Sequence, residues 1–129
     1  MSQIKIYGLR TNLKDIKSKL SDIIHNCVVE SLSYPKDKRA HRFINLEKDD
    51  FYFPEGRTDA YIIIEIMMIS GRKVDTKKNL IKMLFKEIHE QLNISTTDIE
   101  ISITENLASN WGFRGKTGDE VSLNYKIEI

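Results

Sequence analysis

An arginine beside a turn is the residue of this sequence best suited to chemistry on a small anion. Arg72 follows Gly71 at a predicted turn between an apolar strand and a helix. A guanidinium presents a planar fork of donors, which grips a carboxylate through two parallel hydrogen bonds. The same position also suits a solvated residue at the start of a helix. The residue types alone leave both interpretations open.

Arg39 and His41 lie at the start of a predicted strand and are further candidates for substrate binding. For His41, a substrate-facing role and a structural or solvated role are both open. With Arg42 these residues form a short basic stretch, but no aromatic platform for single-stranded nucleic acid accompanies it.

Trp111 and Phe113 are aromatic residues in a glycine-containing segment near the end of the chain. They suit the wall of a small-molecule pocket, and they equally suit a subunit boundary, where such aromatics are enriched. The glycines that follow lack the spacing and the helix of a phosphate-binding loop.

The histidines and the cysteine give no sign of a metal or cofactor. His25 and His89 fall on predicted helices without partners at metal-ligand spacing, so we expect neither metal nor cofactor. Cys27 is the only cysteine and lies among the apolar positions of a helix, which indicates a buried thiol in a reducing compartment.

The bulk composition predicts one soluble domain spanning residues 1–129. Of 129 residues, 40% are apolar and 30% are charged. The 20 basic and 19 acidic residues nearly cancel, which argues against a nucleic-acid partner. The longest apolar run, Tyr61 to Ile69, is too short to span a bilayer, and we expect a cytoplasmic protein with no membrane partner.

Hydrophobic periodicity predicts two helices between four strands, followed by an irregular end. The helices are expected over Leu13–Leu32 and Val74–Asn93. The strands are expected over Ile4–Tyr7, Arg39–Leu46, Tyr61–Ile69 and Asp98–Thr104, and a last alternating run spans Leu123–Ile129.

The two halves of the chain match without a gap when one is shifted by sixty residues. Ile4 then meets Ile64, and Leu20 meets Leu80. The repeat halves are about 4–43 and 64–103, with a C-terminal extension over 105–129. A β-α-β unit places its strands parallel. The predicted fold is therefore α/β (α+β): a duplicated β-α-β forming a four-stranded sheet with two helices on one face.

The strongest predicted strand is apolar on both sides. Ile62, Ile64 and Ile66 point to one face and Tyr61, Ile63 and Glu65 to the other, so much of both faces is apolar and both are expected to need a cover. Two helices cover only one face. We therefore expect a closed oligomer in which another subunit covers the other.

Several short motifs resemble those of the tautomerase superfamily, the trimers that include macrophage migration inhibitory factor and malonate semialdehyde decarboxylase. The similar stretches include Gly56 to Ala60, Gly71-Arg72 before Lys77, Glu105-Asn106, and Asn110 to Phe113. The resemblance covers nearly the whole chain, and the Trp111-x-Phe113 element is its most specific part. It implies a homotrimer with a small carboxylate-bearing ligand bound between subunits.

The resemblance also assigns roles. The family's catalytic base is an amino-terminal proline, and that position is Ser2 here. If Met1 is removed, the α-amine of Ser2 becomes the candidate catalytic base or nucleophile. Arg72, Arg39 and His41 are then the candidate substrate-binding residues, and Trp111 and Phe113 supply an apolar wall.

Two departures from the decarboxylase pattern bear on the reaction. Lys38 stands where that branch has an aspartate, and Ser70 and Arg72 stand where it has a pair of arginines. Decarboxylation of the same substrate is therefore disfavoured. Two classes of function stay open: a tautomerase-like isomerase (or lyase) acting on a keto or enol carboxylic acid, and a non-catalytic ligand-binding or structural trimer.

Overall fold

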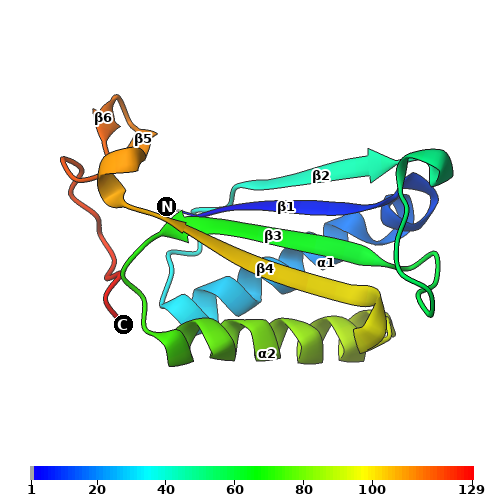
Figure 1. The fold of residues 1–129 in the computed structure, drawn as a ribbon. Coiled ribbons are helices and arrows are strands. Elements are labelled where there is room, and N and C mark those ends of the chain that lie inside the picture. The colour runs from blue at the N-terminus through cyan, green and yellow to red at the C-terminus, as the bar shows by residue number, and fades with distance from the viewer. Residues whose placement is uncertain (1) are drawn as a thin grey trace.

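Two antiparallel helices pack on one face of a four-stranded sheet, and the other face of the sheet is open (Figure 1). The computed structural model describes residues 2–129. The strands of the sheet are β1 (Ser2–Leu9), β2 (His41–Leu46), β3 (Ile62–Ile69) and β4 (Ile99–Asn106). The helices are α1 (Arg10–Leu32) and α2 (Val74–Leu92). The predicted fold class is confirmed, and the predicted elements are all present with ends shifted by a few residues.

Short elements connect and extend this unit. The turns of 3-10 helix are η1 (Lys48–Asp50), η2 (Thr96–Asp98) and η3 (Ala108–Asn110), and a small hairpin pairs β5 (Gly112–Phe113) with β6 (Lys116–Thr117). The predicted alternating run over 123–129 forms no strand. It lies instead beside the start of α2, where the oxygen of Ile129 accepts a hydrogen bond from the backbone nitrogen of Lys73 at 2.9 Å.

The sheet order is β2-β1-β3-β4, with parallel pairs inside each half and an antiparallel pair at the centre. The register repeats the offset found in the sequence. Ile4 lies opposite His41 in the first half, and Ile64 lies opposite Ile101 in the second. The central pairing has Lys5 opposite Glu65 as its midpoint. The two halves are thus related by an approximate twofold axis through that pair.

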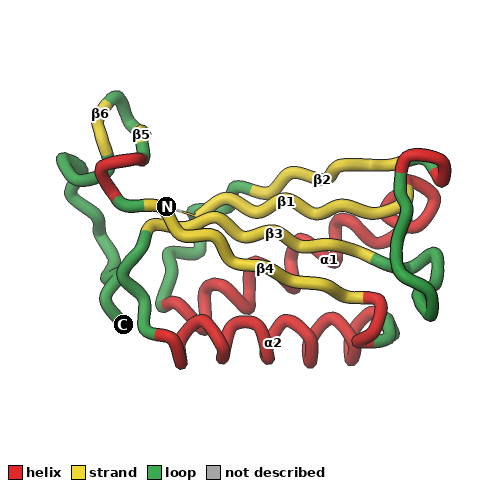
Figure 2. Tube along the Cα trace, viewed as in Figure 1, coloured by secondary structure: helices red, strands yellow, loops and turns green. Residues whose placement is uncertain are grey.

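The core lies between the sheet and the helices, which run side by side in both views (Figure 2). Helical spacing of leucine and isoleucine puts one apolar stripe of each helix against the strands. The same offset of sixty holds at the helix ends, since Ser33 and Asn93 both adopt the left-handed conformation, with φ of 48° and 54°. The largest fully buried side chains include Ile4, Ile6, Leu20, Ile24, Ile62, Ile64, Ile66 and Leu80.

The open face of the sheet is more polar than the sequence suggested. The register puts Lys5 beside Arg42 on one side and Glu65 on the other, and Ile63 and Met67 flank Glu65 along β3. The prediction of two apolar faces was therefore wrong in part, because charged residues occupy the middle of that face.

No helix within residues 2–129 is both long and apolar enough to cross a membrane.

The repeat predicts equal energetic roles for Leu20 and Leu80, which occupy equivalent helix positions and are both fully buried. Replacing either by alanine leaves a cavity, and we expect each to lower the free energy of unfolding by about 2–5 kcal/mol. Urea unfolding at one fixed protein concentration measures this. A loss at one position without a comparable loss at the other would contradict equivalent packing of the two halves.

Candidate functional site

One end of the sheet brings together the start of β1, the connection from β3 to α2, and the last segment of the chain (Figure 1). Because β1 and β3 are antiparallel, Ser2 lies opposite Met68, near the end of β3. Ser2 is buried, with 6% of its surface exposed, and its backbone nitrogen donates a hydrogen bond to Tyr34 Oη at 3.1 Å. The candidate base position is therefore inside the protein.

Arg72 lies in the connection that follows β3 and is 4% exposed. Its Nη1 donates to the backbone oxygen of Ile69 at 3.3 Å. Its Nε and Nη2 are buried and have no hydrogen-bond partner. Those two nitrogens share one edge of the guanidinium plane, the edge that binds a carboxylate through two parallel hydrogen bonds.

A pair of tyrosines links Ser2 and Arg72. The rings of Tyr34 and Tyr125 meet edge to face with centroids 4.9 Å apart. Burial lowers the pKa of Arg72, while the fields of Tyr125 and Tyr34 act in the opposite direction. Burial, followed by the proximity of Tyr34, raises the pKa of Tyr125 above its usual value. The phenol of Tyr125 therefore stays protonated next to the guanidinium.

The sequence analysis missed both tyrosines. Tyr34 sits between the left-handed residue Ser33 and Pro35, and this helix stop turns the chain toward the start of β1. Pro35 was a visible signal for the helix end. Tyr125 had no comparable signal, because it lies in a segment without regular secondary structure.

An ion pair between α2 and β4 lies near Arg72. Lys77 Nζ and Glu105 Oε1 are 2.7 Å apart, and both side chains are about three-quarters buried. Glu105 contributes a smaller favourable field at Arg72. Its carboxylate is held by Lys77, so it leaves the Nε–Nη2 edge of Arg72 open.

The polar contacts of Arg39 and His41 are with α1. His41 Nδ1 lies 2.8 Å from Ser21 Oγ, and Arg39 Nη1 forms an ion pair with Asp22 Oδ1 at 2.7 Å. Burial, reinforced by the positive charge of Arg39, lowers the pKa of His41 to about 4. His41 is therefore neutral at physiological pH. These contacts favour the structural interpretation of His41 that the sequence left open.

Arg39 also lines a basic hollow beside the tyrosine pair. The hollow has a volume of about 340 Å³ and is lined by Asp37, Lys38, Arg39, Ala40 and Arg114. Lys38 Nζ lies 5.4 Å from the ring centroid of Tyr125. The field of Arg114 also reaches Tyr125. The hollow is thus adjacent to the tyrosine that neighbours Arg72.

Trp111 and Phe113 belong to the hairpin region. Trp111 is 7% exposed, and its backbone oxygen accepts a hydrogen bond from Gly118 at 2.6 Å. Gly118 permits this contact, because a Cβ there would lie 2.4 Å from the oxygen of Ala108. The guanidinium of Arg114 lies over the ring of Phe113, with Arg114 Cζ 5.2 Å from the ring centroid. A role for either aromatic as a pocket wall stays a prediction.

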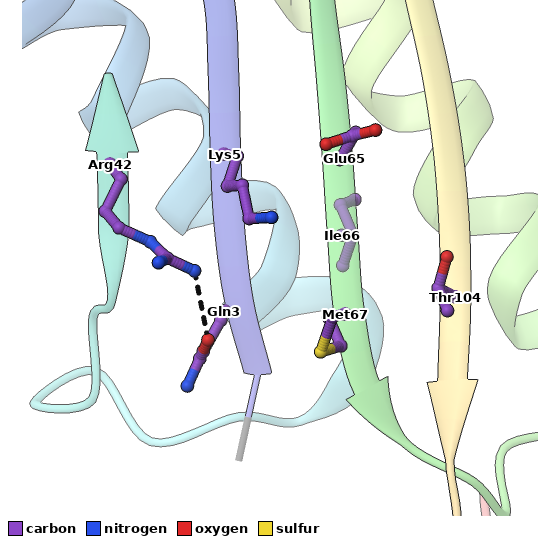
Figure 3. A pocket seen from close by; sticks show the side chains of 7 residues that line it. All are labelled: Gln3, Lys5, Arg42, Glu65, Ile66, Met67 and Thr104. Carbon is purple, nitrogen blue, oxygen red and sulfur yellow. Dashed lines mark hydrogen bonds between the residues drawn. The ribbon is translucent and has the colours of Figure 1, made fainter. Parts of the chain in front are cut away.

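A second, smaller pocket lies on the open face of the sheet (Figure 3). Its volume is about 150 Å³. Arg42 Nη2 donates to Gln3 Oε1 at 3.1 Å, and Lys5 and Glu65 face the same side. The complete lining is Gln3, Lys5, Arg42, Glu65, Ile66, Met67 and Thr104. Within residues 2–129, no group of three or more histidine, cysteine or acidic side chains is arranged to hold a metal ion.

Comparison with known proteins agrees with this fold. A family described as "Tautomerase enzyme" matches residues 38–114. Probable tautomerase YusQ of Bacillus subtilis (strain 168) is 30% identical over 100 residues, covering 74% of this chain and 79% of the relative. Probable tautomerase YrdN of the same organism is 27% identical over 100 residues, covering 74% and 77%.

Solved structures show the same fold at low identity. Malonate semialdehyde decarboxylase superposes with a TM-score of 0.80 at 19% identity, covering 88% of this chain and 92% of that one. A fused 4-OT solved as an asymmetric trimer superposes with a TM-score of 0.80 at 20% identity, covering 91% and 96%. The duplicated β-α-β architecture is that of the tautomerase fold, and the chain belongs to the tautomerase family.

The low pKa of His41 predicts a pH-dependent contribution to stability. Its value falls from 6.5 to about 4 on folding, so the unfolded chain takes up this proton first as the pH drops. The stabilisation from neutral His41 is complete above pH 6.5 and is lost as the pH falls from 6.5 to about 4.

Thermal unfolding across this range should therefore show a shallower pH dependence in His41→Gln than in the wild-type chain. The same substitution at the exposed His89 is the control. An imidazole titration by NMR that places His41 near 6.5 would contradict the prediction.

Proposed function

We propose that this protein is a tautomerase that interconverts the keto and enol forms of a small carboxylic acid. One observation carries the proposal: the unpaired Nε–Nη2 edge of Arg72 is buried beside the phenols, one of which holds the nitrogen of Ser2. A buried guanidinium with open donors stabilises an anionic group that enters without water. The substrate's carboxylate is the group we assign to that edge.

Ser2 supplies the base in this proposal once Met1 has been removed. A free α-amine has a pKa of about 7.7–8.0, and burial disfavours its charged form. The neutral amine takes the proton from the carbon next to the substrate's keto group, and the bond's electrons move to the carbonyl oxygen to give the enol after protonation. The reverse steps regenerate the ketone. These steps need no electron acceptor.

We further propose a homotrimer with the site near a subunit boundary. The solved fused 4-OT is a trimer. The open face of this chain's sheet carries both signs of charge, with Lys5 and Arg42 next to Glu65, and interleaves them with Ile63 and Met67. A face of this composition suits contact with sister chains. In that arrangement Arg39, Trp111 and Phe113 stand close enough to the boundary to contact substrate.

Activity is tested with phenylpyruvate, whose enol is followed by ultraviolet absorbance, on protein whose intact mass shows whether Met1 is absent. We expect Ser2→Pro to raise kcat, since a proline amine is held rigidly by its ring. Arg72→Lys should raise KM about tenfold, because a lysine cannot bind a carboxylate bidentately. Arg10→Lys, at an exposed surface ion pair, is the matched control and should leave both constants unchanged.

An absence of phenylpyruvate turnover in both the wild-type chain and Ser2→Pro would contradict catalysis. If carboxylates then still raised the melting temperature of the wild-type chain but not of Arg72→Lys, the protein would be a non-catalytic binder of the same ligands.

The trimer is tested by sedimentation equilibrium at micromolar concentration, where we expect three times the mass of one chain. Glu65→Lys, in the middle of the open face, should shift the distribution to smaller species. Glu90→Lys, on the exposed side of α2, makes the same charge change and should leave the mass unchanged. A well-folded single chain would contradict the trimer.

A further inference from the structure

The residues of the proposed site are closed off from solvent. Ser2, Tyr34 and Arg72 are each exposed by 6% or less, and Nε and Nη2 of Arg72 are fully buried. A substrate carboxylate therefore has no direct path to the guanidinium edge. Tyr125 is the outermost member of the cluster, because it remains partly exposed while Tyr34 and Arg72 do not.

The segment that carries Tyr125 lies outside the sheet and the helices, although Tyr125 itself packs on the core and against Tyr34. Segment 119–129 contains no helix or strand. Ile129 O accepts hydrogen bonds from Lys73 N at 2.9 Å and Thr76 Oγ1 at 2.8 Å. Ile127 packs against Gly71, where a Cβ would lie 2.9 Å from Ile127 Cγ2. A segment held at a few points, without a ladder of backbone hydrogen bonds, opens at lower cost than the sheet or helices.

A basic hollow lies next to this segment. It is lined by Lys38, Arg39 and Arg114, and two of these cations act directly on Tyr125. Clustered positive charge raises the local concentration of anions. An anion that enters the hollow therefore meets cations that contact Tyr125, and Tyr125 is in turn a neighbour of Arg72.

We propose that segment 119–129 is a gate over the Arg72 site and that Tyr125 is the side chain that must move before a carboxylate reaches Nε and Nη2. The proposal rests on the proposed function only for the identity of the ligand. The closed state leaves two buried donors unpaired, and a bound carboxylate pairs them. The carboxylate therefore binds the open state more tightly than the closed state. This difference in affinity lets the ligand shift the population toward the open state.

The gate is tested by the reaction of phenylglyoxal with arginine, located by peptide mass spectrometry on the full-length protein. We expect Arg72 to be modified at least about tenfold more slowly than the exposed Arg10 in the wild-type chain, as the closed site requires. Tyr125→Ala should bring the rate at Arg72 close to that at Arg10. Tyr52→Ala, which truncates a tyrosine that is 89% exposed, is the control and should change neither rate.

A second variant opens the gate without touching the tyrosine pair. Thr76→Ala removes one hydrogen bond to Ile129 O and should also speed the modification of Arg72 while Arg10 is unaffected. Circular dichroism establishes that each variant is folded. Fast modification of Arg72 in the wild-type chain, or unchanged slow modification in folded Tyr125→Ala, would overturn the gate.

These outcomes are independent of turnover. If Arg72 becomes accessible in Tyr125→Ala but no variant acts on phenylpyruvate, the gate stands and the proposed reaction fails. If phenylpyruvate is turned over and Tyr125→Ala changes neither the modification nor KM, the reaction stands and the gate fails.

Discussion

The antiparallel pairing of β1 with β3 is the constraint on which the site depends. Each half of the chain can form its own parallel β-α-β unit, but only the central pairing joins the halves and sets their direction. This direction puts the first residue of β1 at the same end of the sheet as the last residues of β3. Ser2 and Arg72, seventy positions apart in the sequence, thereby come to lie on either side of Tyr34.

Departures from the approximate twofold symmetry make this end of the sheet different from its opposite. At the opposite end of the sheet, β3 starts after the long connection that follows β2, and β1 runs directly into α1 without a loop. The aromatic residues Phe51, Phe53 and Tyr61 fill that end and pack on one another with ring centroids 5.3–5.7 Å apart. One end is therefore apolar and filled, while the other holds a buried cation. The duplication supplies the scaffold, and the departures from it supply the site.

The sequence predicted the fold well because its signals are local and repeated. The apolar stripes of both helices, the stop at Pro35 and the gap-free offset all follow from residues close together in the chain. The site was less accessible to prediction. Arg72 was singled out by its turn, but its lack of partners on one edge depends on Ile69, Tyr34 and the last segment together.

The sequence pattern was misleading about the open face of the sheet and about His41. In both cases the reason lies in residues of other elements that the pattern of one strand does not include. The open face was predicted to be largely apolar from β3, with Glu65 as its one charged residue, whereas Lys5 and Arg42 on the neighbouring strands add further charge beside Glu65. His41 was considered for substrate binding from its position on a strand. Its register opposite Ile4 points it toward α1, where Ser21 and burial determine its state.

A base formed by the α-amine of Ser2, as in the proposed mechanism, needs more from the surrounding protein than the ring amine of a proline would. A proline nitrogen is oriented by its own ring, and its neutral form has one N–H group to satisfy. A neutral serine α-amine has two, and it rotates freely unless something binds it. In this chain Tyr34 Oη accepts a hydrogen bond from the Ser2 nitrogen inside the protein. Because Tyr34 is itself buried and packed against Tyr125, it is a fixed acceptor. In the proposed mechanism, this phenol, just after the end of α1, restricts the rotation of the Ser2 amine, though less firmly than a covalent ring would.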